Sequence, residues 1–126
     1  MINYTYKGKE ITNGEVFDLE EDDEVTVSSD LHSIQITAGE AWDLVNLPDE
    51  IVEMGLEYWI QVYSYMEAFT LAPDLVITQT KEDLVWEYIG RYIPEEYHRY
   101  FDWEAYWECD LRHNYTETDN YLFENN

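Results

Sequence analysis

Residues 51–69 read IVEMGLEYWIQVYSYMEAF, and this stretch decides the fold that the sequence predicts. Large apolar residues fill most of it, and the polar side chains recur three or four residues apart, at Glu53, Glu57, Gln61 and Ser64. That spacing indicates a helix with one narrow polar stripe. A helix that is apolar around most of its girth lies in a core or at an interface. We therefore expect residues 51–69 to form the central helix.

The chain before this helix has the pattern of β-strands. Apolar and polar residues alternate in 2–6, 25–27 and 33–37, as they do in half-buried strands. Lys7-Gly8-Lys9 can form a turn, and Asn13-Gly14 is the stronger hairpin signal of the two. A short helical segment follows from Gly39 to Val45, and Pro48, Asp49 and Glu50 suit the first turn of the central helix.

The chain after the helix is predicted to mix short strands and helices. Ala72-Pro73-Asp74 indicates a boundary, and residues 75–78 a short strand. Thr80 and Asp83 have the spacing of a helix N-cap. The apolar face of that helix is predicted to hold Leu84, Val85, Tyr88, Ile89 and Tyr92. Pro94 ends it, and further helical stretches over 95–100 and 102–111 precede a closing strand at 121–123.

These elements predict an α+β fold of three regions. Residues 1–38 form a β-rich N-terminal region, 39–72 a helical central region, and 73–126 a C-terminal α+β region with short strands. Residues 103–111 are the leading candidates for a dimer seam.

The charge of the chain is its most unusual property. Twenty-nine acidic residues face six Lys and Arg, so the net charge is −23 and the pI about 4.1. Because 45% of the residues are hydrophobic and 17% aromatic, the chain can still build a core. Such a charge matches about 39 Å of duplex DNA at ~1.7 Å per charge. Direct binding to nucleic acid or to anionic membranes is therefore disfavoured.

Other classes of site lack their sequence signals. Cys109 and His113, with His98 upstream, form only a weak zinc pattern, and the acidic run 20–24 lacks the spacing of a calcium loop. Nucleophile elbows and phosphate-binding glycine loops are absent. We therefore expect no enzyme activity, no cofactor and no metal. A halophilic origin would also give acidity, but the aromatic content argues against it.

The acids are spread over structured segments rather than confined to a tail. Acids at i, i+4 on a helix lie about 6 Å apart, close to the roughly 7 Å between phosphates of one DNA strand. This favours a surface that imitates DNA and accepts hydrogen bonds from phosphate-binding Arg and Lys. The expected contact residues are Glu20, Glu21, Asp22, Asp23, Glu24, Asp49, Glu53, Glu57, Glu82, Asp83, Glu87, Glu95, Glu96, Asp102, Glu104 and Glu108.

Residues 40–124 resemble the ArdA antirestriction family. The resemblance rests on Trp42-Asp43-Leu44-Val45-Asn46-Leu47-Pro48-Asp49-Glu50, on Asp74-Leu75-Val76-Ile77, and on Tyr100-Phe101-Asp102-Trp103-Glu104-Ala105-Tyr106 followed by Asp110-Leu111. It implies an elongated set of three small domains, usually dimeric, that imitates bent DNA and blocks type I restriction–modification enzymes. The chain is shorter than typical members. Trp107 and Glu108 stand where the family tends to have a Gly and a basic residue.

The function expected is that of a DNA mimic that inhibits a host defence enzyme in the bacterial cytoplasm. The lone Cys109 and the lack of a secretory signal or an 18-residue apolar run agree with that compartment. A CRISPR effector is an alternative target. Two further alternatives are an acidic adaptor for another basic protein and a metal-dependent enzyme.

Overall fold

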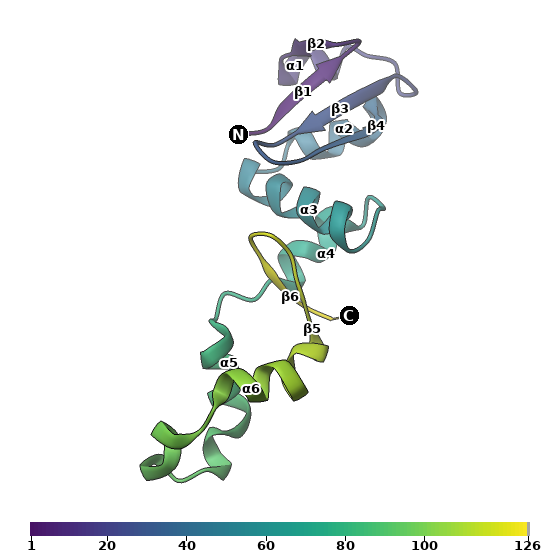
Figure 1. Cartoon of the computed structure of the whole chain (residues 1–126). Coiled ribbons are helices and arrows are strands. Elements are labelled where there is room, and N and C mark those ends of the chain that lie inside the picture. The colour runs from purple at the N-terminus through teal and green to yellow at the C-terminus, as the bar shows by residue number, and fades with distance from the viewer. Residues whose placement is uncertain (126) are drawn as a thin grey trace. The chain divides into compact units, whose positions relative to one another are not determined.

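The structure is a computed structural model that describes residues 1–125, and it confirms an α+β fold (Figure 1). The chain divides into two compact units, Met1–Asp74 and Leu75–Asn126. The β-rich and helical regions expected over 1–38 and 39–72 share one hydrophobic core in the first unit, where sheet residues such as Val27 pack with helix residues such as Leu56.

An antiparallel sheet of four strands, in the order β2-β1-β3-β4, forms one layer of the first unit. Its strands are β1 (Asn3–Tyr6), β2 (Lys9–Ile11), β3 (Glu24–Ser28) and β4 (Ser33–Thr37). Alternate side chains are buried in the core, among them Tyr4, Val25, Val27, Ile34 and Ile36. The opposite face is polar, because Thr26 pairs with Thr5 on one side and with Gln35 on the other.

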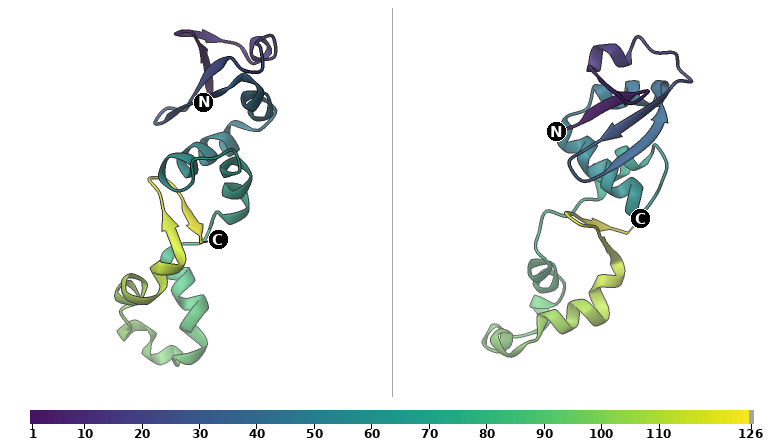
Figure 2. Two further views of the ribbon diagram at one scale, coloured as in Figure 1. Left: turned by 90° about the vertical axis from the view of Figure 1, so that its right-hand side faces the viewer. Right: turned by 45° about the horizontal axis from the view of Figure 1, so that its top comes forward.

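The helices of this unit are α1 (Asn13–Val16), α2 (Ala38–Val45), α3 (Asp49–Gln61) and α4 (Ala68–Leu75). α2 and α3 lie against the sheet, as Figure 2 shows, and α4 packs on α3. The indole N–H of Trp42 donates to the Val16 carbonyl oxygen at 2.8 Å and so ties α2 to α1. The predicted boundary residue Pro73 lies inside α4.

The hairpin predicted at Asn13-Gly14 is wrong. Lys7 and Gly8 have φ values of 51° and 79° and make the turn between β1 and β2. Asn13 and Gly14 instead open α1, because Thr12 caps that helix: its hydroxyl accepts from the Glu15 N–H at 3.2 Å, and the Glu15 carboxylate accepts from the Thr12 N–H.

The single central helix predicted over 51–69 is also wrong, because the chain reverses after Gln61. The Ser64 hydroxyl donates to the Trp59 carbonyl oxygen at 2.9 Å, which satisfies a carbonyl at the end of α3. α4 then returns and sets the ring of Phe69 against Gly55 of α3. A Cβ at Gly55 would lie 2.2 Å from a carbon of that ring. Gly55 therefore permits a close approach that any larger residue would block.

The second unit is built from short elements. They are α5 (Lys81–Ile89), the 3₁₀-helices η1 (Gly90–Tyr92) and η2 (Glu95–Tyr100), α6 (Trp103–Tyr106), the π-helix η3 (Trp107–Leu111), the 3₁₀-helix η4 (Arg112–Asn114), β5 (Tyr115–Glu117) and β6 (Leu122–Glu124). Leu84, Val85, Ile89, Trp107 and Leu111 form its core.

Several aromatic residues of this unit pack on one another. Trp86 stacks on the His98 ring at 4.4 Å between centroids. Trp86 also contacts the ring of Phe101, which in turn contacts that of Tyr106. Trp107 and Leu111 are 4% and 3% exposed, so these two side chains belong to the core of their own unit and are not available for a dimer seam.

The N-cap predicted at Thr80 is confirmed, since its hydroxyl accepts from the Asp83 N–H at 3.1 Å. The strand expected over 75–78 is reduced to an isolated bridge between Val76 and Phe123, beside the hairpin of β5 and β6. Across residues 1–125, no helix is both long enough and apolar enough to cross a membrane.

Candidate functional site

The carboxylates, which the sequence singles out, lie almost entirely on the surface. Twenty-five of the twenty-nine acidic side chains are exposed, three are half-buried, and one is buried. The buried one is Glu57, which is 2% exposed. Its prediction as a contact residue is wrong, because α3 is buried around its whole girth from Met54 to Tyr58. Eight of the sixteen predicted contact residues lie in each unit.

The acidic run 20–24 is an ordered loop whose backbone is fastened to the start of α2. The Ala38 N–H donates to the Asp23 carbonyl oxygen at 2.7 Å, and the Gly39 N–H donates to that of Glu21 at 3.1 Å. The Asp23 carboxylate accepts from the Glu20 N–H at 3.0 Å. Glu24 is the first residue of β3. The loop therefore holds its anions in place, and the positive end of the α2 dipole lowers the cost of gathering them.

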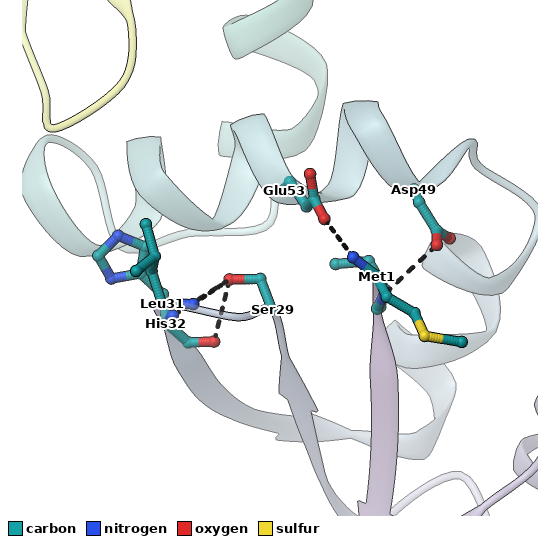
Figure 3. Close-up of polar contacts among 7 residues, drawn as sticks. Met1, Ser29, Leu31, His32, Asp49 and Glu53 are labelled. Atoms are coloured by element: carbon teal, nitrogen blue, oxygen red, sulfur yellow. Dashed lines mark hydrogen bonds and ion pairs between the residues drawn. The ribbon is translucent and has the colours of Figure 1, made fainter.

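Asp49 and Glu53, on α3, hold the first strand of the sheet (Figure 3). The α-amino group of Met1 donates to the Glu53 carboxylate at 2.6 Å, and the Ile2 N–H donates to the Asp49 carboxylate at 3.3 Å. The hydrogen bond to Glu53 is the main cause that raises the pKa of the Met1 amino group above its usual 8.0. These two carboxylates therefore already have partners within the fold.

The acids of the second unit gather at the first turns of its helices. Glu82 and Asp83 occupy the first turn of α5, Glu95 and Glu96 that of η2, and Glu104 that of α6. Negative side chains are favourable at these positions because they face the positive end of the helix dipole. Repeated helix starts thus explain why a short chain can place many carboxylates on its surface.

Three further predicted contact residues of this unit have intramolecular contacts. Asp102 caps α6, where its carboxylate accepts from the Ala105 N–H at 3.0 Å. Glu87 accepts from the Gln79 amide at 3.0 Å. Glu108 pairs with Arg112 at 2.8 Å, but both side chains are more than half exposed, so the pair adds little stability.

Exposed tyrosines are the feature that sequence reasoning missed. Tyr88, Tyr92, Tyr97 and Tyr100 are 59%, 74%, 55% and 71% exposed. The predicted burial of Tyr88 and Tyr92 on the apolar face of one helix is wrong. Tyr92 lies beyond α5, which ends at Ile89 where the tighter η1 begins, and Tyr88 is exposed within α5. The sequence signal that could have indicated this exposure is Pro94, which lies close to both tyrosines and interrupts helical periodicity.

These four residues, the tyrosine patch, lie in a stretch of the strongly acidic chain where the charge balances. Residues 88–100 hold two Arg and two Glu, so their formal charge is zero with His98 neutral. The guanidinium groups of Arg91 and Arg99 lie 5.7 and 4.7 Å from the ring centroids of Tyr92 and Tyr100. Tyr and Arg are the residues most enriched at the energetic centres of protein interfaces. The patch therefore resembles a protein-binding surface.

Two half-buried tyrosines near the patch are held in the neutral form. Burial, with Tyr88 and Asp110 nearby, raises the pKa of Tyr106 above its usual value of 10.0. Burial also raises the pKa of Tyr115, together with the negative charges of Glu124 and Glu87. Both phenols stay protonated near neutral pH and can donate hydrogen bonds.

The exposed carboxylates present acceptors for charge-assisted hydrogen bonds from cationic groups. Within residues 1–125, no three His, Cys, Asp or Glu side chains come together as a metal site would require. Comparison with known proteins adds no functional residue: no family model, no curated protein and no solved structure matches this chain.

Proposed function

We propose that this protein is a non-enzymatic DNA mimic that occupies the DNA-binding groove of a bacterial defence enzyme, with a type I restriction–modification complex as the first candidate. The observation that carries the proposal is the exposure of twenty-five of twenty-nine carboxylates in a chain with only six Lys and Arg. Six Lys and Arg cannot neutralise most of these anions, so the surface keeps a large negative charge that a cationic partner can neutralise.

The mimic would work by replacing phosphates. An enzyme that binds DNA holds it mainly through Arg and Lys contacts to phosphate oxygens. Carboxylates accept the same charge-assisted hydrogen bonds, and each is worth about 1.5–3 kcal/mol. The ordered loop 20–24 and the helix starts of the second unit fix the backbone that carries these carboxylates, which lowers the entropy lost on binding. Fifteen of the predicted contact residues remain in this proposal, without the buried Glu57.

The tyrosine patch would add contacts that do not depend on salt. Carboxylate contacts weaken as ions screen them over a Debye length of about 8 Å at physiological salt. Stacking and apolar contact through Tyr92 and Tyr100, the two most exposed rings of the patch, are much less sensitive to screening. The partner, acting in the bacterial cytoplasm, would thus be recognised by charge and by shape. A homodimer remains part of this proposal, as does a CRISPR effector as the alternative target.

Competition for DNA tests the proposal. A purified type I restriction–modification complex is bound to a labelled duplex that carries its site, and the protein is titrated in at fixed salt. We expect displacement of the duplex, while binding of DNA to a histone-like basic protein is little affected. Equal displacement from both would instead support an acidic adaptor. Failure to displace the duplex from restriction and CRISPR complexes alike would refute DNA mimicry.

Charge-matched variants then locate the contact surface. The triple variant Glu95→Gln, Glu96→Gln and Glu104→Gln removes three proposed contacts, and Glu10→Gln, Asp18→Asn and Asp30→Asn removes three exposed charges outside the proposed set. Since about 1.4 kcal/mol corresponds to tenfold in affinity, we expect the first variant to weaken inhibition at least about tenfold and the second less than about threefold. Equal losses would show that net charge alone is responsible.

A further inference from the structure

An apolar groove on the first unit has no role in the proposed function. It lies between the end of α2, the start of α3 and α4, and its volume is about 720 Å³, within the range of ligand-binding clefts. Its lining is mostly apolar, from Leu44, Leu47, Ile51, Met66, Phe69 and Pro73. Leu47, Ile51 and Met66 are only half-buried. The groove therefore offers apolar surface that the fold itself does not cover.

Two carboxylates border this apolar lining. Asp43 and Glu67 line the groove from α2 and from the segment before α4, and both are exposed. No Lys or Arg lies among the lining residues, and the sequence has none between Lys9 and Lys81. Residues 38–74 carry eight acidic side chains and no Lys or Arg. An occupant of the groove therefore meets a strongly negative surface around an apolar centre.

We propose that this groove binds an amphipathic helix of a basic partner protein. Apolar side chains three and four residues apart on such a helix would enter the groove, as they do in helix-in-groove complexes. Its flanking Lys and Arg would reach Asp43 and Glu67, with their aliphatic stems along the apolar lining. Anionic ligands, anionic membranes and a second copy of this chain all bring negative charge to a negative surface, so charge complementarity selects the cationic helix.

The proposal does not depend on DNA mimicry, because a peptide can enter the groove whether or not the protein displaces DNA. The probe is a capped helical peptide of about 18 residues, built from Leu, Lys and Ala with Leu on one face. Its control has the same composition with the Leu residues spread around the helix. Isothermal titration calorimetry at physiological salt should show the amphipathic peptide binding about tenfold more tightly or better, a difference of about 1.4 kcal/mol. Equal affinities of the two peptides would refute helix binding in the groove and leave only non-specific electrostatic attraction.

A pair of matched substitutions places the binding site. Thr70 is exposed and lines the groove, so Thr70→Lys puts an ammonium group and its stem there. Thr78→Lys makes the same charge change at an exposed position outside the groove. We expect Thr70→Lys to weaken binding of the amphipathic peptide at least about fivefold, and Thr78→Lys less than about twofold. Similar losses in both variants would overturn the assignment.

A second pair keeps the test decisive if Thr70→Lys perturbs folding, which far-UV circular dichroism would reveal. Asp43→Asn with Glu67→Gln removes the two carboxylates of the groove, and Glu10→Gln with Asp18→Asn removes two exposed charges elsewhere in the same unit. The first pair should reduce affinity for the amphipathic peptide several-fold more than the second. If the second pair has the same effect as the first, the groove is not where the peptide binds.

Discussion

The contact between α3 and α4 provides the sharpest test of the fold. Replacing Gly by Ala in a helix interior normally stabilises it by about 1 kcal/mol, because Gly loses more backbone entropy on folding. At Gly55 we expect the opposite sign. The added Cβ would lie 2.2 Å from one carbon of the Phe69 ring and 2.8 Å from another, whereas carbons in good contact are about 3.5–4.0 Å apart.

The size of the destabilisation by Gly55→Ala depends on how far the Phe69 ring must move to accept the added Cβ. Phe69 is 4% exposed and its ring lies 5.9 Å from that of Trp59, so to accept the added Cβ the ring must shift from its packed position toward the groove that it lines. Overpacking a core costs about 1–3 kcal/mol, and an overlap this deep belongs at the upper end. After the helix-propensity gain of about 1 kcal/mol, we expect Gly55→Ala to destabilise the first unit by about 2 kcal/mol. For a domain of this size that lowers the melting temperature by roughly 8–16 °C.

Urea unfolding and thermal melts followed by far-UV circular dichroism measure this change. Gly14→Ala is the control in the same unit, since its Cβ would meet nothing closer than 3.9 Å; it should be neutral or stabilising by up to about 1 kcal/mol. Adding Phe69→Leu should remove most of the penalty of Gly55→Ala in a double-mutant cycle. A stabilising Gly55→Ala, or a penalty unchanged by Phe69→Leu, would show that the two helices do not pack in this way.

Three further outcomes are expected. Raising NaCl from about 0.02 to about 0.5 M should raise the melting temperature by screening repulsion between surface carboxylates, and an unchanged melt would contradict that crowding. Burial raises the pKa of Tyr4 to about 12 from 10.0. The protonated phenol therefore contributes up to about 2.7 kcal/mol to the free energy of unfolding, and this contribution is complete below pH 10 and is lost as the pH rises through 12. Stability measured across this range should fall less in Tyr4→Phe, and an identical fall would exclude Tyr4 as the cause. Thr80→Ala should cost about 1 kcal/mol of unfolding free energy by removing the α5 cap, against under about 0.5 kcal/mol for exposed Thr78→Ala, and equal costs would exclude the cap.

Some of the candidate surface is structural, and this affects how variants should be interpreted. Asp49 and Glu53 hold the first strand, and Asp102 caps α6. Neutralising them would destabilise the fold as well as remove charge. Glu95, Glu96 and Glu104 are exposed at first turns of helices, so they separate the two effects better.

The sequence by itself determined the features that depend on residue type and local spacing. The net charge of −23, the strands with alternating residues and the cap at Thr80 all follow from neighbours along the chain. The exposure of most carboxylates follows as well, because a charged group loses its hydration when it is buried.

Only the tertiary structure decided the features that depend on residues far apart in sequence. The apolar pattern of 51–69 fits one long helix, but the chain instead reverses after Gln61 and brings Phe69 back onto Gly55. The same burial around the girth of α3 encloses Glu57, and the end of α5 at Ile89 places the exposed Tyr92 outside the helix predicted for it. Periodicity reports which faces are apolar, but it does not report where a helix ends or which surface covers it, because packing against distant segments sets both.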